Sequence, residues 1–273
     1  MRGFAEECHG DGLRTGLWLA PFVCETRSAI YQEHPDWLLR VNGEPWYCGC
    51  NWSGFYALDI DNQEVQAYLK NVFHRVLEDW GFDLVKLDFL YAAAPFGSER
   101  ESRAARMARA MALLRQWCGD KLILGCGVPL MPCFGVVDYC RIGCDVSLDW
   151  DDKWFMRLIH RERVSTRQSI DNTIFRRQLN GRAFGNDPDV VLLRDENCTL
   201  TPAEKQKLAA ANGCFSQILL CSDPVERYSA ENRERYAWVQ RLFDRAEGIK
   251  TEADNGLSIG FRLDGKRYSI RIR

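Results

Sequence analysis

Short apolar runs alternate along this chain with longer segments in which apolar residues recur at helical spacing. The first pattern is typical of buried strands and the second of amphipathic helices, so the sequence predicts strands separated by helices. The predicted strands span residues 15–23, 82–90, 121–124, 136–142, 187–193 and 215–221. The main predicted helices span residues 62–80, 102–117, 166–179, 201–212 and 232–246. From residue 257 the pattern changes to strict alternation up to residue 272, which predicts a β-hairpin.

Helices between successive strands favour a parallel sheet, because parallel neighbours need crossover connections. Polar residues gather where the predicted strands end: Lys86 and Asp88, then Cys126, then Arg141 and Asp145. The carboxyl ends of the strands carry the active site in a (β/α)₈ barrel. An open doubly wound sheet would instead have a glycine-rich phosphate loop after its first strand, and no such loop is found in the sequence. The sequence therefore predicts an α/β fold of the TIM-barrel type.

The strand at 82–90 contains two ionisable residues in an otherwise apolar run that is typical of a strand buried on both faces. Lys86 and Asp88 are two positions apart, so their side chains point to the same face. Burying such charges is costly unless they are paired or used. Two interpretations remain open: a structural Lys86–Asp88 ion pair, or a catalytic carboxylate kept ionised by a neighbouring cation.

Composition narrows the class of protein. With 273 residues, 46% hydrophobic and 27% charged, and a net charge of -2, the chain is typical of a globular protein with either one large domain or one domain and a small appendage. The sequence has no basic block of the kind that binds nucleic acid, so we expect no nucleic-acid partner. It also has no apolar run long enough to span a membrane. Acidic residues near the start do not fit a signal peptide, so we expect a cytoplasmic protein.

Most of the twelve cysteines lie in or beside apolar runs, as expected for buried thiols in a reducing compartment. Cys48 and Cys50 form a close pair, but no second pair follows at the spacing of a zinc site. We therefore predict no metal.

Two carboxylates on different strand ends of one barrel are the minimum equipment for glycoside hydrolysis. Asp88 would act as nucleophile and Asp145 as acid and then base, about 5 to 5.5 Å apart in a retaining enzyme. The apolar neighbours of Asp145, Cys144 and Val146, favour surroundings in which an acid keeps its proton. A Schiff-base aldolase using Lys86 is a rival chemistry, although the sequence offers it no phosphate site.

Six segments in this order resemble glycoside hydrolase family 36, the α-galactosidases or melibiases. They are Gly16–Pro21, Glu33–Trp37, Lys86–Leu90, Gly125–Pro129, Arg141–Asp145 and Asn186–Asp189. The resemblance implies a retaining enzyme that removes terminal α-galactosyl residues from oligosaccharides by double displacement, without metal or cofactor. It makes Asp88 the nucleophile and Asp145 the general acid/base. It also implies a galactose pocket lined by Trp18, Lys86, Cys126, Arg141 and, through its backbone, Gly143. Relatives that transfer galactose or act on α-N-acetylgalactosaminides leave the exact reaction open.

The resemblance further implies that the strand at 15–23 is the third barrel strand. We therefore expect an incomplete barrel (strands three to eight) over residues 1–248 and the start of a carboxy-terminal β-domain over 249–273. A non-catalytic fragment of such an enzyme is the alternative, because open barrel edges favour aggregation or pairing and would leave the chain poorly soluble or weakly active by itself. Related enzymes are often multimeric, so a homo-oligomer is compatible with the resemblance.

Overall fold

The computed structural model describes residues 1–98, 101–159, 164–253 and 256–273. These residues form two compact units, Met1–Cys140 and Arg141–Arg273. The predicted domain boundary after residue 248 concerns a different division and stays a prediction. In the described part of the chain, no helix has both the length and the apolar character needed to cross a bilayer.

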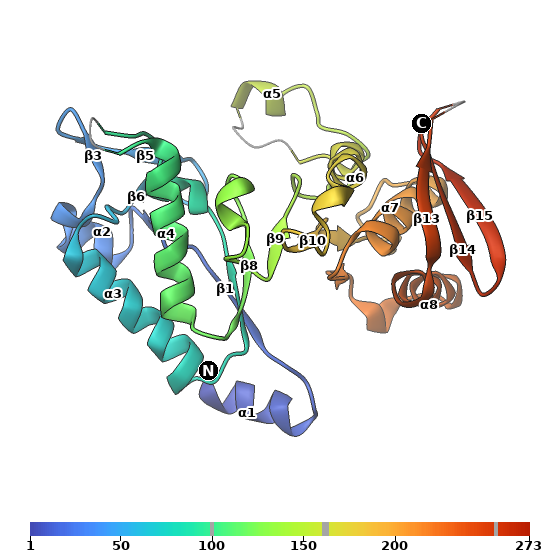
Figure 1. Cartoon of the computed structure of the whole chain (residues 1–273), viewed down its shortest axis with the longest axis horizontal. Helices are drawn as coiled ribbons and strands as arrows, with labels where there is room; N and C mark the ends of the chain where they lie inside the picture. Colours follow the sequence, from blue (N-terminus) through green and yellow to red (C-terminus); the bar gives the residue numbers. More distant parts are fainter. Residues whose placement is uncertain (99–100, 160–163, 254–255) are drawn as a thin grey trace. The chain divides into compact units, whose positions relative to one another are not determined.

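The first unit is built on a parallel sheet. Its strands are β1 (Gly16–Leu19), β7 (Leu84–Leu87), β8 (Leu122–Gly125) and β9 (Tyr139–Arg141), paired in that order (Figure 1). The register places Trp18 beside Lys86, and Lys86 beside Leu124. Because the strands are parallel, residues that follow β1, β7 and β8 emerge at the same edge of the sheet.

Helices α3 (Gln63–His74) and α4 (Arg103–Cys118) run side by side along this sheet (Figure 1). Each helix begins with a capping side chain that accepts a backbone N–H. The Asn62 side chain caps α3, and the Ser102 side chain caps α4. Their apolar faces supply the core of the unit. Fully buried or nearly so are Val65, Leu69, Phe73, Met107, Met111 and Leu114.

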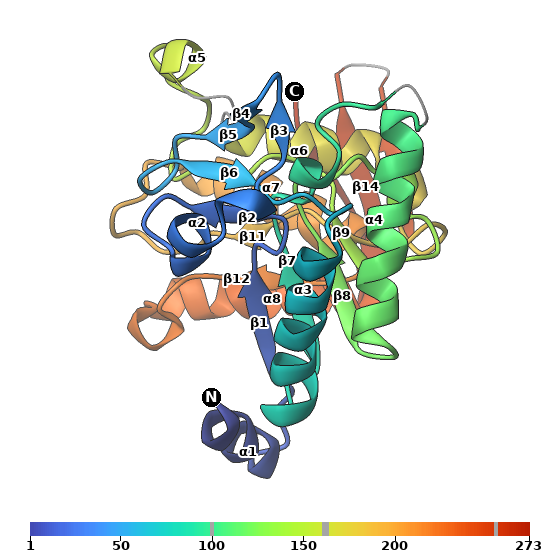
Figure 2. The ribbon, with the colours of Figure 1, turned by 90° about the vertical axis from the view of Figure 1, so that its left-hand side faces the viewer.

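Helix α1 (Arg2–Gly10) lies at the amino-terminal end of β1, as Figure 2 shows. Asp83 holds the helix there, because its Oδ2 is hydrogen-bonded both to the His9 ring, at 2.8 Å, and to the Thr15 N–H, at 2.9 Å. Burial acts to raise the pKa of Asp83, but these two donors outweigh burial and hold the pKa below its ordinary value.

The aromatic-rich connection after β1 is ordered. It holds helix α2 (Ala29–Glu33), the hairpin β3 (Arg40–Val41) and β4 (Glu44–Pro45), and a three-stranded antiparallel sheet. The sheet consists of β2 (Val23–Glu25), β6 (Phe55–Ala57) and β5 (Tyr47–Gly49), in that order. Phe55 and Cys48 are almost fully buried in it. The segment therefore forms a small subdomain of its own.

The second unit contains the short strands β10 (Gly185–Asp187), β11 (Val190–Val191) and β12 (Leu220–Cys221), and β11 and β12 pair in parallel. Its helices are α5 (Met156–Ile159), α6 (Thr166–Phe175), α7 (Pro202–Phe215) and α8 (Ala230–Arg245). An antiparallel sheet follows, made of β13 (Glu247–Glu252), β14 (Ser258–Leu263) and β15 (Lys266–Arg271). Leu208, Leu242 and Phe261 join helices and sheet in one core.

Short helical turns complete the described elements. They are η1 (Pro35–Trp37), η2 (Arg75–Asp79), η3 (Leu90–Ala93), η4 (Met131–Cys133), η5 (Arg177–Leu179) and η6 (Val225–Arg227).

The alternation of strands and helices follows the sequence prediction, with several differences. The strand predicted at 15–23 ends at Leu19, and Val23 begins β2 in another sheet. β7 is shorter than predicted and not buried on both faces, because Leu84 and Lys86 are only partly covered while Val85 and Leu87 are buried. The single strand predicted at 187–193 is two strands, since Asp189 has a φ of 75° and turns the chain between them. Residues 215–221 are largely not strand either, because α7 runs to Phe215 and β12 spans two residues.

The predicted hairpin at 257–272 corresponds to β14 and β15, and the sequence missed the third strand, β13. β13 lacks the alternation of its neighbours: none of its residues is buried, and its register shifts between Glu247 and Lys250. Whether the barrel is incomplete stays a prediction.

Candidate active site

Asp88 directly follows β7, and each of its carboxylate oxygens has a donor in the first unit. The indole Nε1 of Trp18, on the neighbouring strand β1, donates to Oδ2 at 3.2 Å. The backbone N–H of Phe89 donates to Oδ1 at 2.7 Å. Two fixed donors hold the plane of a carboxylate, and such hydrogen bonds to a charged group are stronger than those between neutral groups. The Trp18 side of the site is open, because this residue is 44% exposed.

Lys86 and Cys126 lie beside Asp88 at the same edge of the sheet. Lys86 makes no hydrogen bond or ion pair within the described ranges, so the structural Lys86–Asp88 ion pair considered from the sequence is not formed. Cys126, 7% exposed, follows β8, and its backbone links the strands: its N–H donates to the Leu87 carbonyl at 2.8 Å. The first unit therefore brings together four of the predicted site residues, namely Trp18, Lys86, Asp88 and Cys126.

The second unit contains the other predicted residues, arranged around Arg141. Its guanidinium is 3% exposed and contacts three carboxylates. Nη1 donates to Asp145 Oδ1 at 2.6 Å, Nη2 to Asp189 Oδ1 at 2.7 Å and Nε to Asp187 Oδ2 at 3.1 Å. A planar guanidinium with five N–H donors suits such a junction, which a lysine could not reproduce.

Asp187 and Asp189 are the buried members of this cluster. Burial raises the pKa of Asp189 above its ordinary value, although the Arg141 guanidinium and the Val146 N–H oppose that rise. Asp189 Oδ2 accepts the Val146 N–H at 2.7 Å, and Asp187 Oδ1 accepts the Asp189 N–H at 2.8 Å. The cluster thus fixes the backbone on either side of Asp145.

Asp145 itself differs from the sequence prediction. Its carboxylate is not enclosed by apolar neighbours; the side chain is 55% exposed and held at one oxygen by Arg141. Gly143, two residues earlier, lies against α6: a Cβ added there would be 3.1 Å from the Cβ of Asn172. That approach is closer than most side-chain contacts, so the chain between Arg141 and Asp145 packs tightly on the helix only with glycine at 143.

Sequence reasoning did not single out Asp187 and Asp189 beyond their place in the segment Asn186–Asp189. The available signal was their spacing: two acids two positions apart, at a break between strands, can converge on one cation. The two candidate catalytic aspartates lie one in each unit, Asp88 in the first and Asp145 in the second. Their roles, and those of the five predicted sugar-binding residues, stay predictions.

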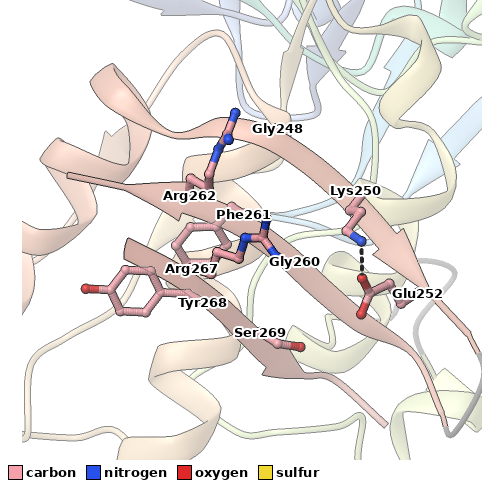
Figure 3. A pocket seen from close by; sticks show the side chains of 9 residues that line it. All are labelled: Gly248, Lys250, Glu252, Gly260, Phe261, Arg262, Arg267, Tyr268 and Ser269. Carbon is pink, nitrogen blue, oxygen red and sulfur yellow. Dashed lines mark ion pairs between the residues drawn. The ribbon is translucent and has the colours of Figure 1, made fainter. Parts of the chain in front are cut away.

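A separate hollow of about 460 Å³ lies on the β13–β15 sheet (Figure 3). Basic side chains dominate its lining, with Lys250, Arg262 and Arg267 against one acid, Glu252. Glu252 is paired with Lys250 at 2.5 Å. With one carboxylate, already paired, the hollow lacks the two acids that glycoside hydrolysis uses.

Comparison with known proteins relates the chain to α-galactosidases. Residues 1–115 match the family model named Melibiase. The α-galactosidase Mel36A of Lactobacillus acidophilus is 32% identical over 85 residues, which are 31% of this chain and 11% of that enzyme. The α-galactosidase TtGalA of Thermus thermophilus, solved with p-nitrophenyl α-D-galactopyranoside, is 32% identical with a TM-score of 0.82. The match covers 98% of this chain and 54% of TtGalA.

The first 115 residues of the chain thus match the melibiase family model, and the chain resembles α-galactosidases in sequence and in fold. The resemblance stated from the sequence is thereby confirmed. The chain also shares its fold with the GH36 α-galactosidase AgaA of Geobacillus stearothermophilus, at 15% identity and a TM-score of 0.57 over 97% of this chain and 37% of AgaA. Its structural neighbours are enzymes of the TIM-barrel type. The chain spans about half the length of TtGalA and a smaller part of AgaA and Mel36A.

Proposed function

We propose that this chain is the catalytic part of a retaining α-galactosidase that removes terminal α-galactosyl residues from small oligosaccharides. The observation that carries the proposal is the setting of Asp88, a carboxylate with one donor on each oxygen beside an exposed tryptophan. Similarity to α-galactosidases, one of them solved with stachyose, supports the substrate class. We also propose a cytoplasmic protein whose barrel strands correspond to strands three to eight, and which is able to form homo-oligomers.

In the proposed first step, an Asp88 oxygen attacks the anomeric carbon while the bond from that carbon to the leaving oxygen breaks. The Asp145 carboxylic acid gives its proton to the leaving oxygen. In the second step the Asp145 carboxylate takes a proton from water, the water oxygen bonds to the anomeric carbon, and the ester bond to Asp88 breaks. Two inversions leave the anomeric configuration unchanged.

The other predicted residues would bind the sugar. Trp18 offers an exposed ring face, Lys86 offers an ammonium with no protein partner in the described ranges, and Arg141 positions Asp145. Cys126 and the Gly143 backbone are the remaining proposed contacts to the sugar. Cations that donate to hydroxyl groups and an aromatic ring under the apolar sugar face are the usual means of holding a neutral sugar.

The first test is hydrolysis of p-nitrophenyl α-galactoside by the wild type and by Asp88→Asn. Asp120→Asn removes the same charge from an exposed surface position and serves as the control. We expect release of nitrophenol by the wild type and the control, and a loss of at least about 1,000-fold in Asp88→Asn. Absence of hydrolysis by the wild type would instead support the alternative of a non-catalytic chain.

Azide separates the two aspartates by role. In Asp88→Ala azide can attack the anomeric carbon from the vacated side, which gives β-galactosyl azide. In Asp145→Ala azide replaces water in the second step, which gives α-galactosyl azide. The same azide anomer from both variants would contradict the assignment of the two roles.

A further inference from the structure

Phe89, the residue after the candidate nucleophile, has an unusual backbone conformation. Its φ is 53° and its ψ is 30°, in the left-handed region that bulky side chains rarely adopt. Of the residues with positive φ in the described part of the chain, Phe89 is the one directly bonded to a predicted catalytic residue. A strained conformation next to a reactive group persists only where surrounding contacts hold it.

The left-handed turn has a direct geometric consequence. It ends β7 and directs the Phe89 N–H back to Oδ1 of the preceding side chain, Asp88, at 2.7 Å. A residue that continued the strand would point this N–H along the sheet instead. The turn therefore supplies one of the two donors that fix the carboxylate, and Trp18 supplies the other.

An aromatic cage holds the Phe89 ring from several sides. The ring centroids of Phe55, Trp52, Tyr91 and Trp18 lie 5.0, 5.5, 6.3 and 6.5 Å from that of Phe89, all with steeply inclined rings. Such edge-to-face arrangements are favourable for aromatic pairs. Phe55 is 1% exposed, so the cage is anchored in the small antiparallel sheet rather than in solvent.

The backbone of Gly127 also contacts the turn at Phe89. Its carbonyl accepts the Tyr91 N–H at 2.7 Å. A Cβ added at Gly127 would lie 3.1 Å from the Phe89 nitrogen and 3.3 Å from Asp88 Oδ1, and its own φ is 59°. No side chain fits there without displacing the carboxylate or its donor.

We propose that Phe89 is a positioning residue for Asp88, which acts through its left-handed backbone and is held in that conformation by the aromatic cage and by Gly127. The inference rests on the proposed function, since it assigns a purpose to the setting of the nucleophile. It differs from a simple packing role, because the backbone conformation rather than the buried volume of the ring determines the activity.

Two substitutions separate these roles. Glycine adopts the left-handed region freely, so Phe89→Gly removes the ring but keeps the turn. Valine keeps a buried apolar group but resists a positive φ because it is β-branched. We expect kcat to fall about threefold in Phe89→Gly and at least about 30-fold in Phe89→Val, since a nucleophile misplaced by about 1 Å costs on the order of 100-fold. KM should change little in either, as expected when the loss is confined to the transition state.

Gly127→Ala tests the same turn from the other side, and Gly119→Ala is its matched control. Both glycines have a positive φ, 59° and 55°, but a Cβ at Gly119 would meet nothing within 4 Å. Both substitutions place a Cβ on a residue with a positive φ, so a loss of kcat of about tenfold or more confined to Gly127→Ala would come from displacement of Asp88 and Phe89.

Amide exchange at residue 89 is a readout that needs no turnover and distinguishes failure of this inference from failure of the proposed function. We expect the residue 89 amide to exchange slowly in the wild type and in Phe89→Gly. In Asp88→Ala, Phe89→Val and Gly127→Ala we expect its exchange rate to rise by about tenfold or more. An inactive wild type with this protection pattern would refute the hydrolase and support the positioning role. Higher activity in Phe89→Val than in Phe89→Gly would overturn the positioning role, because activity would then follow side-chain volume. A residue 89 amide that is equally protected without the Asp88 carboxylate would overturn it as well.

Discussion

Arg141 donates from Nη1 to Oδ1 of Asp145 at 2.6 Å, and this bond joins a guanidinium that is 3% exposed to a carboxylate that is 55% exposed. The other nitrogens of the same guanidinium donate to Asp187 and Asp189. The buried cation therefore holds the exposed candidate acid in one place, and the two buried carboxylates hold the cation.

Arg141→Lys should break this junction. One ammonium cannot reach three carboxylates, so at least one buried acid loses its partner. We expect the free energy of unfolding to fall by about 3 kcal/mol, as for other buried ion pairs deprived of one member. We also expect kcat/KM for the aryl galactoside to fall about 100-fold. Urea unfolding and steady-state kinetics measure the two effects.

The matched control is Arg109→Lys. Arg109 also bridges two acids, Asp61 and Glu101, but is 38% exposed. Partly exposed ion pairs contribute about 1 kcal/mol or less, so stability and activity should stay close to the wild type. Equal effects of Arg109→Lys and Arg141→Lys would contradict the role given to the buried cluster.

Trp18→Phe removes the indole N–H and keeps an aromatic ring. Asp88 then loses the donor to Oδ2, and a hydrogen bond to a charged group contributes about 1.5 to 3 kcal/mol. We expect kcat to fall at least about tenfold. Trp117→Phe is the control, because Trp117 packs its ring on Phe73 with centroids 5.8 Å apart, on the helical side of the unit. A rise in KM with kcat unchanged would refute the Asp88 contact as the cause.

Asp83→Asn should alter how stability depends on pH. The pKa of Asp83 is lower in the folded chain than its reference value of 3.8, because donation from Thr15 and His9 outweighs burial. A lowered folded pKa adds stability above the unfolded pKa, and this stability is lost as pH falls toward the folded pKa. We expect Asp83→Asn to cost about 1 kcal/mol at pH 6 and progressively less below about pH 4. Urea unfolding across pH 2.5 to 7 is the measurement, and a cost that grows on acidification would contradict the sign.

Thiol labelling should follow burial. Burial raises the pKa of Cys24, Cys118 and Cys214 to about 12, whereas Cys50 is exposed. At pH 8 a thiol of pKa 12 is a thiolate in only about one molecule in 10,000. We expect iodoacetamide to modify Cys50 first and these three only after unfolding in urea, as read by peptide mass spectrometry. Modification of Cys118 in the native chain at the rate of Cys50 would show that the core is not closed.

The local sequence determined much of the architecture. Periodicity and capping residues located α3, α4, α7 and α8, since helix ends depend on neighbours in sequence, such as Thr201 and Glu204 at the start of α7. Polar residues at strand ends located Asp88 and Arg141, because parallel strands place those positions at a common edge.

Tertiary structure alone decided which charges meet. The spacing of Lys86 and Asp88 predicts a shared face, but in the structure Trp18 and the Phe89 backbone hold Asp88, and Lys86 makes no ion pair with it. A distant strand supplies the first donor, 70 residues away in the chain. No local pattern could show this contact.

The same holds for backbone conformation. Strand residues have a negative φ, and the apolar runs around Phe89 and Asp189 predicted continuous strands where the structure has a positive φ. An aromatic cage overrides that preference at Phe89, and hydrogen bonds to Arg141 and Val146 override it at Asp189. The sequence by itself therefore determined most of the elements and the resemblance to α-galactosidases. The settings of the candidate catalytic groups depend on long-range contacts that stabilise conformations which are locally unfavourable.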